Sequence, residues 1–226
     1  MTDRSTEDLA QQLVGNLSPM KPIDRLRVAA SAVVALWIAA VVVMSWMTGS
    51  WPRFGDVAFW TDPITVAVLL GLVIAAVGAV VAALASAVPG REPLARVGRA
   101  SAGTAAIWLI GCGLWAVAGA ESKSAASSIA DSASCFAHAL VLAIPAALAA
   151  SFYLSRGAPQ HRLIASGVAA AGAAGLGAVA VHATCSVAGG FHLLLGHCLT
   201  PTLAGLAFAL PLAGLARRWT PTAFES

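Results

Sequence analysis

Residues 64–88 read ITVAVLLGLVIAAVGAVVAALASAV, an apolar run that contains no charged side chain. About 20 residues of α-helix cross a hydrocarbon core about 30 Å thick, and a helix satisfies its own backbone hydrogen bonds in lipid. The run therefore predicts a transmembrane helix. The whole chain has the same character, with 59% hydrophobic residues, 10% charged residues and a mean hydropathy of +0.83. Soluble domains carry about 25% charged residues, so the composition indicates an integral membrane protein.

The same length and hydropathy criteria predict further spans on both sides of this run. The expected spans are residues 28–48, 64–88, 101–120, 135–154, 163–183 and 198–216. The last span contains Pro201 and Pro211, which membrane helices tolerate better than soluble helices do. No alternating strand pattern is present. We therefore expect an all-α fold: a six-helix transmembrane domain at 28–219, preceded by a polar segment at 1–27 and followed by a short tail at 220–226.

The positive charges indicate the orientation, because short cytoplasmic loops retain Lys and Arg. With the N-terminus inside, the outer loops hold only Arg53 and Lys123. The inner segments hold the other basic residues: Arg4, Lys21, Arg25, Arg27, Arg91, Arg96, Arg99, Arg156, Arg162, Arg217 and Arg218. Both termini are therefore expected in the cytoplasm. This asymmetry accounts for the net charge of +3, and we expect no direct nucleic-acid partner.

The N-terminal segment 1–27 has the pattern of a short amphipathic helix. Ser5 or Thr6 can cap it, and Pro19 ends it. Its apolar face and a neighbouring acid are the candidate partner-binding residues Leu9, Leu13, Val14, Leu17 and Asp8. Such a short helix is marginal alone. It would either place its apolar face in the groove of a partner protein, lie on the inner membrane surface, or pack against the inner loops.

Most of the soft-ligand side chains fall at the predicted outer ends of the last three spans. These candidate metal or redox residues are Cys135, His138, His182, Cys185, His192, His197 and Cys198. The pairs Cys135/His138 and His182/Cys185 are each three residues apart, which places both members on one helix face. Thiolate and imidazole select copper(I), zinc and similar ions, whereas thiols in an oxidising compartment can form a disulfide. The shared position predicts a metal-sensing or redox-sensing site, although each spacing alone is also compatible with packing. Cys112, in the middle of a span, is expected to be buried outside this site.

Three other patterns carry structural expectations. The Ser-rich connection 121–134 is expected to be an exposed loop. The aromatic residues near the first outer loop are expected to form an interfacial belt, and they are Trp46, Trp51, Phe54, Phe59 and Trp60. The glycines of the fifth span are expected to serve helix packing, and they are Gly167, Gly172, Gly175 and Gly177.

Several short motifs resemble those of the NrsF-like membrane anti-sigma factors. They are LSPMKPIDRLR at 17–27, CFAHAL at 135–140, SRGAP at 155–159, HATC at 182–185 and FHLLLGHCLTP at 191–201. The resemblance covers nearly the whole chain. It implies a bacterial inner-membrane protein, not an enzyme, whose cytoplasmic N-terminus sequesters an extracytoplasmic-function (ECF) sigma factor. Metal binding or oxidation at the outer side would release that factor.

The resemblance also assigns individual residues. The two sensing cysteines of the family correspond to Cys135 and Cys185, and its histidine before the last span corresponds to His197. The chain departs from the family pattern at Gly196, which replaces a tryptophan, at the extra thiol Cys198, and at Asn16, which replaces an acidic residue.

A different class of function uses the same outer residues. A membrane metal transporter or a thiol oxidoreductase could also place Cys and His at this face. An oxidoreductase would be expected to have a vicinal thiol pair, and a transporter would be expected to have polar groups at the midplane, where the chain offers little besides Cys112. The sequence therefore favours a sensor over a catalyst or a conduit.

Overall fold

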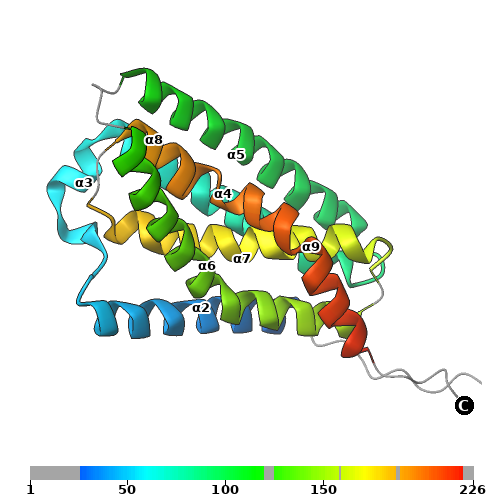
Figure 1. The fold of residues 1–226 in the computed structure, drawn as a ribbon. Coiled ribbons are helices and arrows are strands. Elements are labelled where there is room, and N and C mark those ends of the chain that lie inside the picture. The colour runs from blue at the N-terminus through cyan, green and yellow to red at the C-terminus, as the bar shows by residue number, and fades with distance from the viewer. Residues whose placement is uncertain (1–25, 120–124, 158, 187–188, 221–226) are drawn as a thin grey trace, which may run out of the picture.

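The computed structural model describes residues 26–119, 125–157, 159–186 and 189–220, and every regular element in these ranges is helical (Figure 1). In chain order the elements are α2 (Leu26–Thr48), η1 (Arg53–Gly55), α3 (Val57–Thr61), α4 (Pro63–Ser86), α5 (Glu92–Gly119), α6 (Ala125–Arg156), α7 (Arg162–Thr184), α8 (Gly190–Leu193), η2 (Leu194–Cys198) and α9 (Thr200–Arg218). The all-α prediction is confirmed for these ranges. The partner-binding candidates Asp8, Leu9, Leu13, Val14 and Leu17 lie outside them.

Within the described ranges, six helical segments are long and apolar enough to cross a membrane, as expected from the sequence. They are Leu26–Thr48, Pro63–Ser86, Glu92–Gly119, Ile129–Arg156, Arg162–Thr184 and Gly190–Arg218. The last segment joins α8, η2 and α9, so it begins before the residue 198 that hydropathy suggested. The Ser-rich stretch 125–134 is helical rather than a loop. It contains no glycine or proline to interrupt a helix, and Ser132 within it is buried.

Helix α7 lies at the centre of the bundle. It packs against α4, α6 and α9, while α5 packs on α4 and α2 packs on α6. The start of α2 and the end of α9 lie at one end of the bundle, which we call the proximal end (Figure 1). Helices α3 and α8 lie at the opposite end, which we call the distal end (Figure 1). Of the predicted Cys and His residues, His182, Cys185, His192, His197 and Cys198 lie at or near helix ends, whereas Cys135 and His138 lie inside α6, which begins at Ala125.

Small residues let the helices around α7 approach closely, which confirms the packing role expected for its glycines. A Cβ atom added to Gly175 would lie 3.0 Å from the Ala76 Cβ of α4. A Cβ atom added to Gly177 would overlap the backbone carbonyl of Ala139 in α6. Such contacts bring the helix backbones directly against each other, so α4 and α6 pack closely on α7.

The aromatic belt prediction is wrong for one residue. Trp46, Trp51, Phe54 and Trp60 are exposed, but Phe59 is only 3% exposed. Its helix α3 begins at Asp56, whose side chain accepts a hydrogen bond from the Ala58 backbone N–H at 2.9 Å. Helix α3 packs on α4, so Phe59 is buried, and its ring centroid lies 6.2 Å from that of His182.

Candidate metal centre

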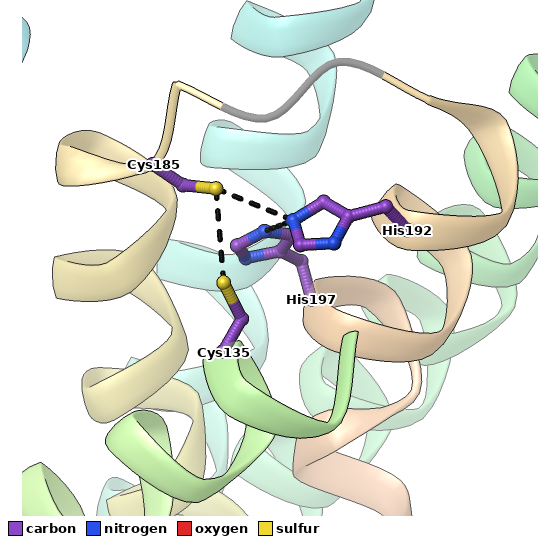
Figure 2. A group of neighbouring side chains, drawn as sticks. All are labelled: Cys135, Cys185, His192 and His197. Carbon is purple, nitrogen blue, oxygen red and sulfur yellow. Dashed lines mark hydrogen bonds between the residues drawn. The ribbon is translucent and has the colours of Figure 1, made fainter. Parts of the chain in front are cut away.

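Four side chains from separate helical segments converge at the distal end of the bundle (Figure 2). Cys135 lies in α6, Cys185 follows α7, His192 lies in α8 and His197 lies in η2. One ligand atom from each of these residues lies within 4.8 Å of the other three. We call this group the Cys/His centre.

The distances within the Cys/His centre form a chain of contacts. The Sγ atoms of Cys135 and Cys185 are 3.7 Å apart, and Cys185 Sγ is 3.2 Å from His192 Nε2. His192 Nε2 is in turn 3.2 Å from His197 Nε2. Both sulfurs and both ring nitrogens therefore face a common point.

Cys135 and Cys185 approach each other because α6 and α7 pack closely just below them. Gly177 of α7 lies against the backbone of Ala139 in α6, one helical turn beyond Cys135. Cys185 is the residue at which α7 ends: its backbone is extended, with φ −72° and ψ 129°, while its N–H still donates to the Val181 carbonyl at 2.8 Å. The chain therefore leaves the helix at Cys185, and the side chain of Cys185 points toward α6 (Figure 2).

His192 and His197 meet because the helix between them widens into a π turn. Residues five apart in an α-helix point about 140° away from each other. In η2 the Leu199 N–H instead donates to the Leu194 carbonyl, five residues back, at 3.0 Å. Pro201, two residues after Leu199, has no N–H for the His197 carbonyl four residues earlier, so this hydrogen bond of a regular α-helix is missing at the π turn. The π turn brings both imidazoles to one side (Figure 2).

Gly196 explains how η2 can lie against α6. A Cβ atom added there would be 3.3 Å from the Ser132 Cα and 3.4 Å from the Cys135 Cβ. These contacts are tighter than most Cβ contacts in proteins, so a side chain at this position would push α6 and η2 slightly apart. Gly196 thus lets η2, which carries His197, lie close to Cys135.

The two imidazoles are deeply buried, with His192 and His197 each 1% exposed. The Nδ1 atoms of both rings are buried and have no hydrogen-bond partner among the described residues. Leaving a buried polar atom unpaired costs about 1–3 kcal/mol. A favourable interaction at the Nε2 atoms, which face each other and Cys185, would offset this cost.

The donor set fits an ion of the zinc or copper(I) type, and two of the three separations given above match tetrahedral geometry. The third, 3.2 Å between Cys185 Sγ and His192 Nε2, is shorter than the roughly 3.5 Å that this geometry gives. With metal–sulfur bonds of about 2.3 Å and metal–nitrogen bonds of about 2.05 Å, tetrahedral geometry places two sulfurs about 3.8 Å apart and two nitrogens about 3.3 Å apart. The corresponding separations in the Cys/His centre are 3.7 Å for the sulfurs and 3.2 Å for the nitrogens. Two thiolates and two imidazoles are also ligand types that such ions prefer.

Other side chains support the Cys/His centre from behind. His182 Nε2 lies 3.0 Å from the Thr65 carbonyl of α4, and the His182 ring centroid is 5.1 Å from that of His197. Arg53 donates from Nη1 to the Cys185 carbonyl at 3.4 Å and from Nη2 to the Asp56 carboxylate at 2.7 Å. The hydrogen bond from Arg53 holds the pKa of the Asp56 carboxyl below its usual value. Arg53 thus links the connection after α2 to the end of α7.

The structure separates the seven predicted ligand candidates into two groups. Cys135, Cys185, His192 and His197 come together, whereas His138, His182 and Cys198 supply no ligand atom to the Cys/His centre. His138 is exposed, and its Nδ1 lies 2.8 Å from the Ser134 carbonyl of its own helix. Cys198 is 1% exposed and lies with Cys112 in an apolar core.

Two supporting residues escaped sequence reasoning. Arg53 counted only as an outer-loop charge, and Phe59 counted as an interfacial aromatic. The segment from Arg53 to Asp56 carried a weak signal, because an arginine three residues before the acidic cap of a helix can pair with that cap.

Comparison with known families gives one match. The family model NrsF, described as negative regulator of sigma F, matches residues 13–219, a range that contains all four residues of the Cys/His centre. No curated protein and no solved structure matches the chain.

Proposed function

The chain belongs to the NrsF family of negative regulators of sigma F, and from this premise we propose that it is a membrane-bound anti-sigma factor controlled by its Cys/His centre. In this proposal the N-terminal segment 1–27 sequesters an ECF sigma factor on the cytoplasmic side of the bacterial inner membrane. A change at the Cys/His centre, on the opposite side, releases it.

The observation that carries the sensing half is the convergence of four ligand atoms, all within 4.8 Å of one another, from three parts of the chain. Cys135, Cys185 and the His192/His197 pair come from α6, the end of α7 and the last membrane segment. A bound transition-metal ion would supply a cross-link between these segments. Because the ligands must be deprotonated thiolates and neutral imidazoles, binding would release protons from Cys135 and Cys185.

The topology of the proposal is supported by the charges at the two ends of the bundle. Arginines lie at the start of α2, α5 and α7 and at the end of α6 and α9, all of which belong to the proximal end. Among the described residues, the distal end carries Arg53 as its arginine, in the connection between α2 and α3. Since Lys and Arg are retained on the cytoplasmic side, the Cys/His centre would face the periplasm.

Two contacts provide a route from the Cys/His centre to the N-terminal segment. Arg53, just after α2, contacts the Cys185 carbonyl, and Trp37 in the middle of α2 donates from Nε1 to the Leu176 carbonyl of α7 at 2.8 Å. A shift of α6 and α7 on ligation would therefore change the tilt of α2, which leads directly into residues 1–25. A ligand that prefers the releasing state a hundredfold supplies about 2.7 kcal/mol for this shift.

Oxidation is a second way to trigger release of the sigma factor, and the contact between the two sulfurs supports it. At 3.7 Å, Cys135 Sγ and Cys185 Sγ are close enough to form a disulfide after an approach of about 1.7 Å. In that reaction the two thiols give up two protons and two electrons to an oxidant. Such a bond would remove both sulfurs from the ligand set, so metal ligation and oxidation exclude each other.

The proposal is tested by co-expressing the full chain with the sigma factor encoded beside it and capturing the complex in detergent. We expect the wild-type chain to capture the sigma factor and to release it on addition of zinc, copper(I), cadmium or an oxidant. The Cys135→Ser/Cys185→Ser variant should capture the sigma factor but not release it. Cys112→Ser, the matched control, should behave as wild type.

Two results would contradict different halves of the proposal. If the full chain captures no sigma factor, the regulatory role is wrong. If capture occurs but no metal ion or oxidant loosens it, the sensing role is wrong and only a tether remains.

A further inference from the structure

A cavity of about 510 Å³ lies at the proximal end, far from the Cys/His centre. Its floor is formed by the end of α4, one wall by the start of α5 and the other wall by the start of α7. The lining side chains that matter here are Ser86 on α4, Arg96 and Arg99 on α5, and His161 and Ile164 at the start of α7.

The charge in this cavity is predominantly positive. Arg96 and Arg99, one turn apart on α5, have no carboxylate partner among the described residues. The single acid in the lining, Glu92, accepts a hydrogen bond from the Gly90 backbone N–H at 3.2 Å. Two guanidinium groups that line one cavity and lack a counter-ion present a site for a phosphate group.

Apart from Gln160, the remaining lining is apolar. Ala82 lies on the floor, Ala95 lies on the α5 wall, and Ala165 and Val168 lie on the α7 wall. Small side chains on α4 leave a groove between α5 and α7, because both helices pack on α4. The lining thus combines two arginines with several apolar side chains, which matches a headgroup attached to an acyl chain.

We propose that this cavity binds an anionic phospholipid, with the phosphate on Arg96 and Arg99 and an acyl chain along Ala165 and Val168. Basic pockets between membrane helices on the cytoplasmic side are sites where anionic headgroups bind. The proposal rests on the proposed topology, which places the proximal end in the cytoplasm. It does not depend on metal sensing or on capture of a sigma factor.

The test is native mass spectrometry of the full chain in detergent with phosphatidylglycerol or phosphatidylethanolamine of identical acyl chains. We expect one phosphatidylglycerol to bind with clear preference. Each arginine near the headgroup contributes about 1 kcal/mol, so Arg96→Gln/Arg99→Gln should weaken this binding about 30-fold. Arg217→Gln/Arg218→Gln, the matched control at the same end on α9, should change it less than threefold.

Several outcomes would overturn the proposal. Equal binding of the two lipids by the wild-type chain would overturn it without any measurement on a variant. Equal losses in both double variants would indicate non-specific attraction. Competition by glycerol 3-phosphate as strong as that by the lipid would indicate a site for free anions. Loss of sigma-factor capture in Arg96→Gln/Arg99→Gln with unchanged lipid preference would indicate a protein-docking site instead.

Discussion

Replacing Cys135 by serine should weaken metal binding by a calculable amount. Structural zinc sites bind with about 10–16 kcal/mol in total, so one of four ligands accounts for about 3–4 kcal/mol. Because about 1.4 kcal/mol corresponds to a factor of ten, Cys135→Ser should raise the Kd for zinc about 100- to 1000-fold. Cys135 is partly exposed at a helix surface, so the substitution should leave the fold intact.

The assay is competition between the full chain in detergent and a chromophoric zinc chelator, which yields both the stoichiometry and the Kd. We expect one zinc ion per chain. Cys112→Ser is the matched control, because it makes the same chemical change at a buried thiol that supplies no ligand atom to the Cys/His centre. The reasoning would be refuted if Cys135→Ser bound zinc within threefold of wild type, or if Cys112→Ser lost as much affinity.

Three further predictions follow from contacts around the Cys/His centre and α7. Gly177→Ala should lower the free energy of unfolding by about 1–3 kcal/mol and weaken zinc binding, because the new Cβ would overlap the Ala139 backbone. Gly103→Ala, which has open space around it, should change neither quantity. Thermal unfolding in detergent measures stability and the chelator assay measures zinc affinity; equal stability of the two variants would contradict the packing argument. Trp37→Phe removes the hydrogen bond to the Leu176 carbonyl but keeps an aromatic ring. The zinc concentration that releases the sigma factor should therefore change, while the Kd for zinc stays within threefold of wild type. An unchanged release concentration would exclude this contact from the route between the Cys/His centre and α2. The Arg53 hydrogen bond lowers the pKa of Asp56, so the Arg53–Asp56 ion pair is present above the usual pKa of 3.8 and is lost only as pH falls through the lower folded value. Asp56→Asn should therefore alter metal-triggered release by a constant factor from pH 8 to pH 5. A factor that changes within this range would contradict an ion pair that stays intact over it.

Sequence patterns predicted the helices better than the helix ends. Runs such as 64–88 exceed the length needed to cross a membrane, so the existence of each span followed from hydropathy alone. The start of α6 could not be predicted from hydropathy, because Ser and Ala between 125 and 134 neither favour a span nor exclude a helix. That extension is stabilised by packing of Ser132 and Cys135 against Gly196, a contact between segments far apart in the chain.

The candidate site was predictable only in part, again because contacts between segments far apart in the chain decide its geometry. Cys135 and Cys185 were expected to lie at one end of the bundle, but the choice of His192 and His197 over His138 and His182 depends on the π turn. The proline after that turn was visible, yet its effect on the register of the histidines required the backbone. Likewise Phe59 could not be distinguished from its exposed aromatic neighbours without the position of α3 over α4.

The most direct test of the Cys/His centre is X-ray absorption spectroscopy of the zinc-loaded full chain. Our account predicts two sulfur ligands at about 2.3 Å and two nitrogen ligands at about 2.0 Å, with the imidazole scattering lost in the His192→Ala/His197→Ala variant. A first coordination shell made only of oxygen and nitrogen, or one that is the same in this variant as in the wild-type chain, would contradict it.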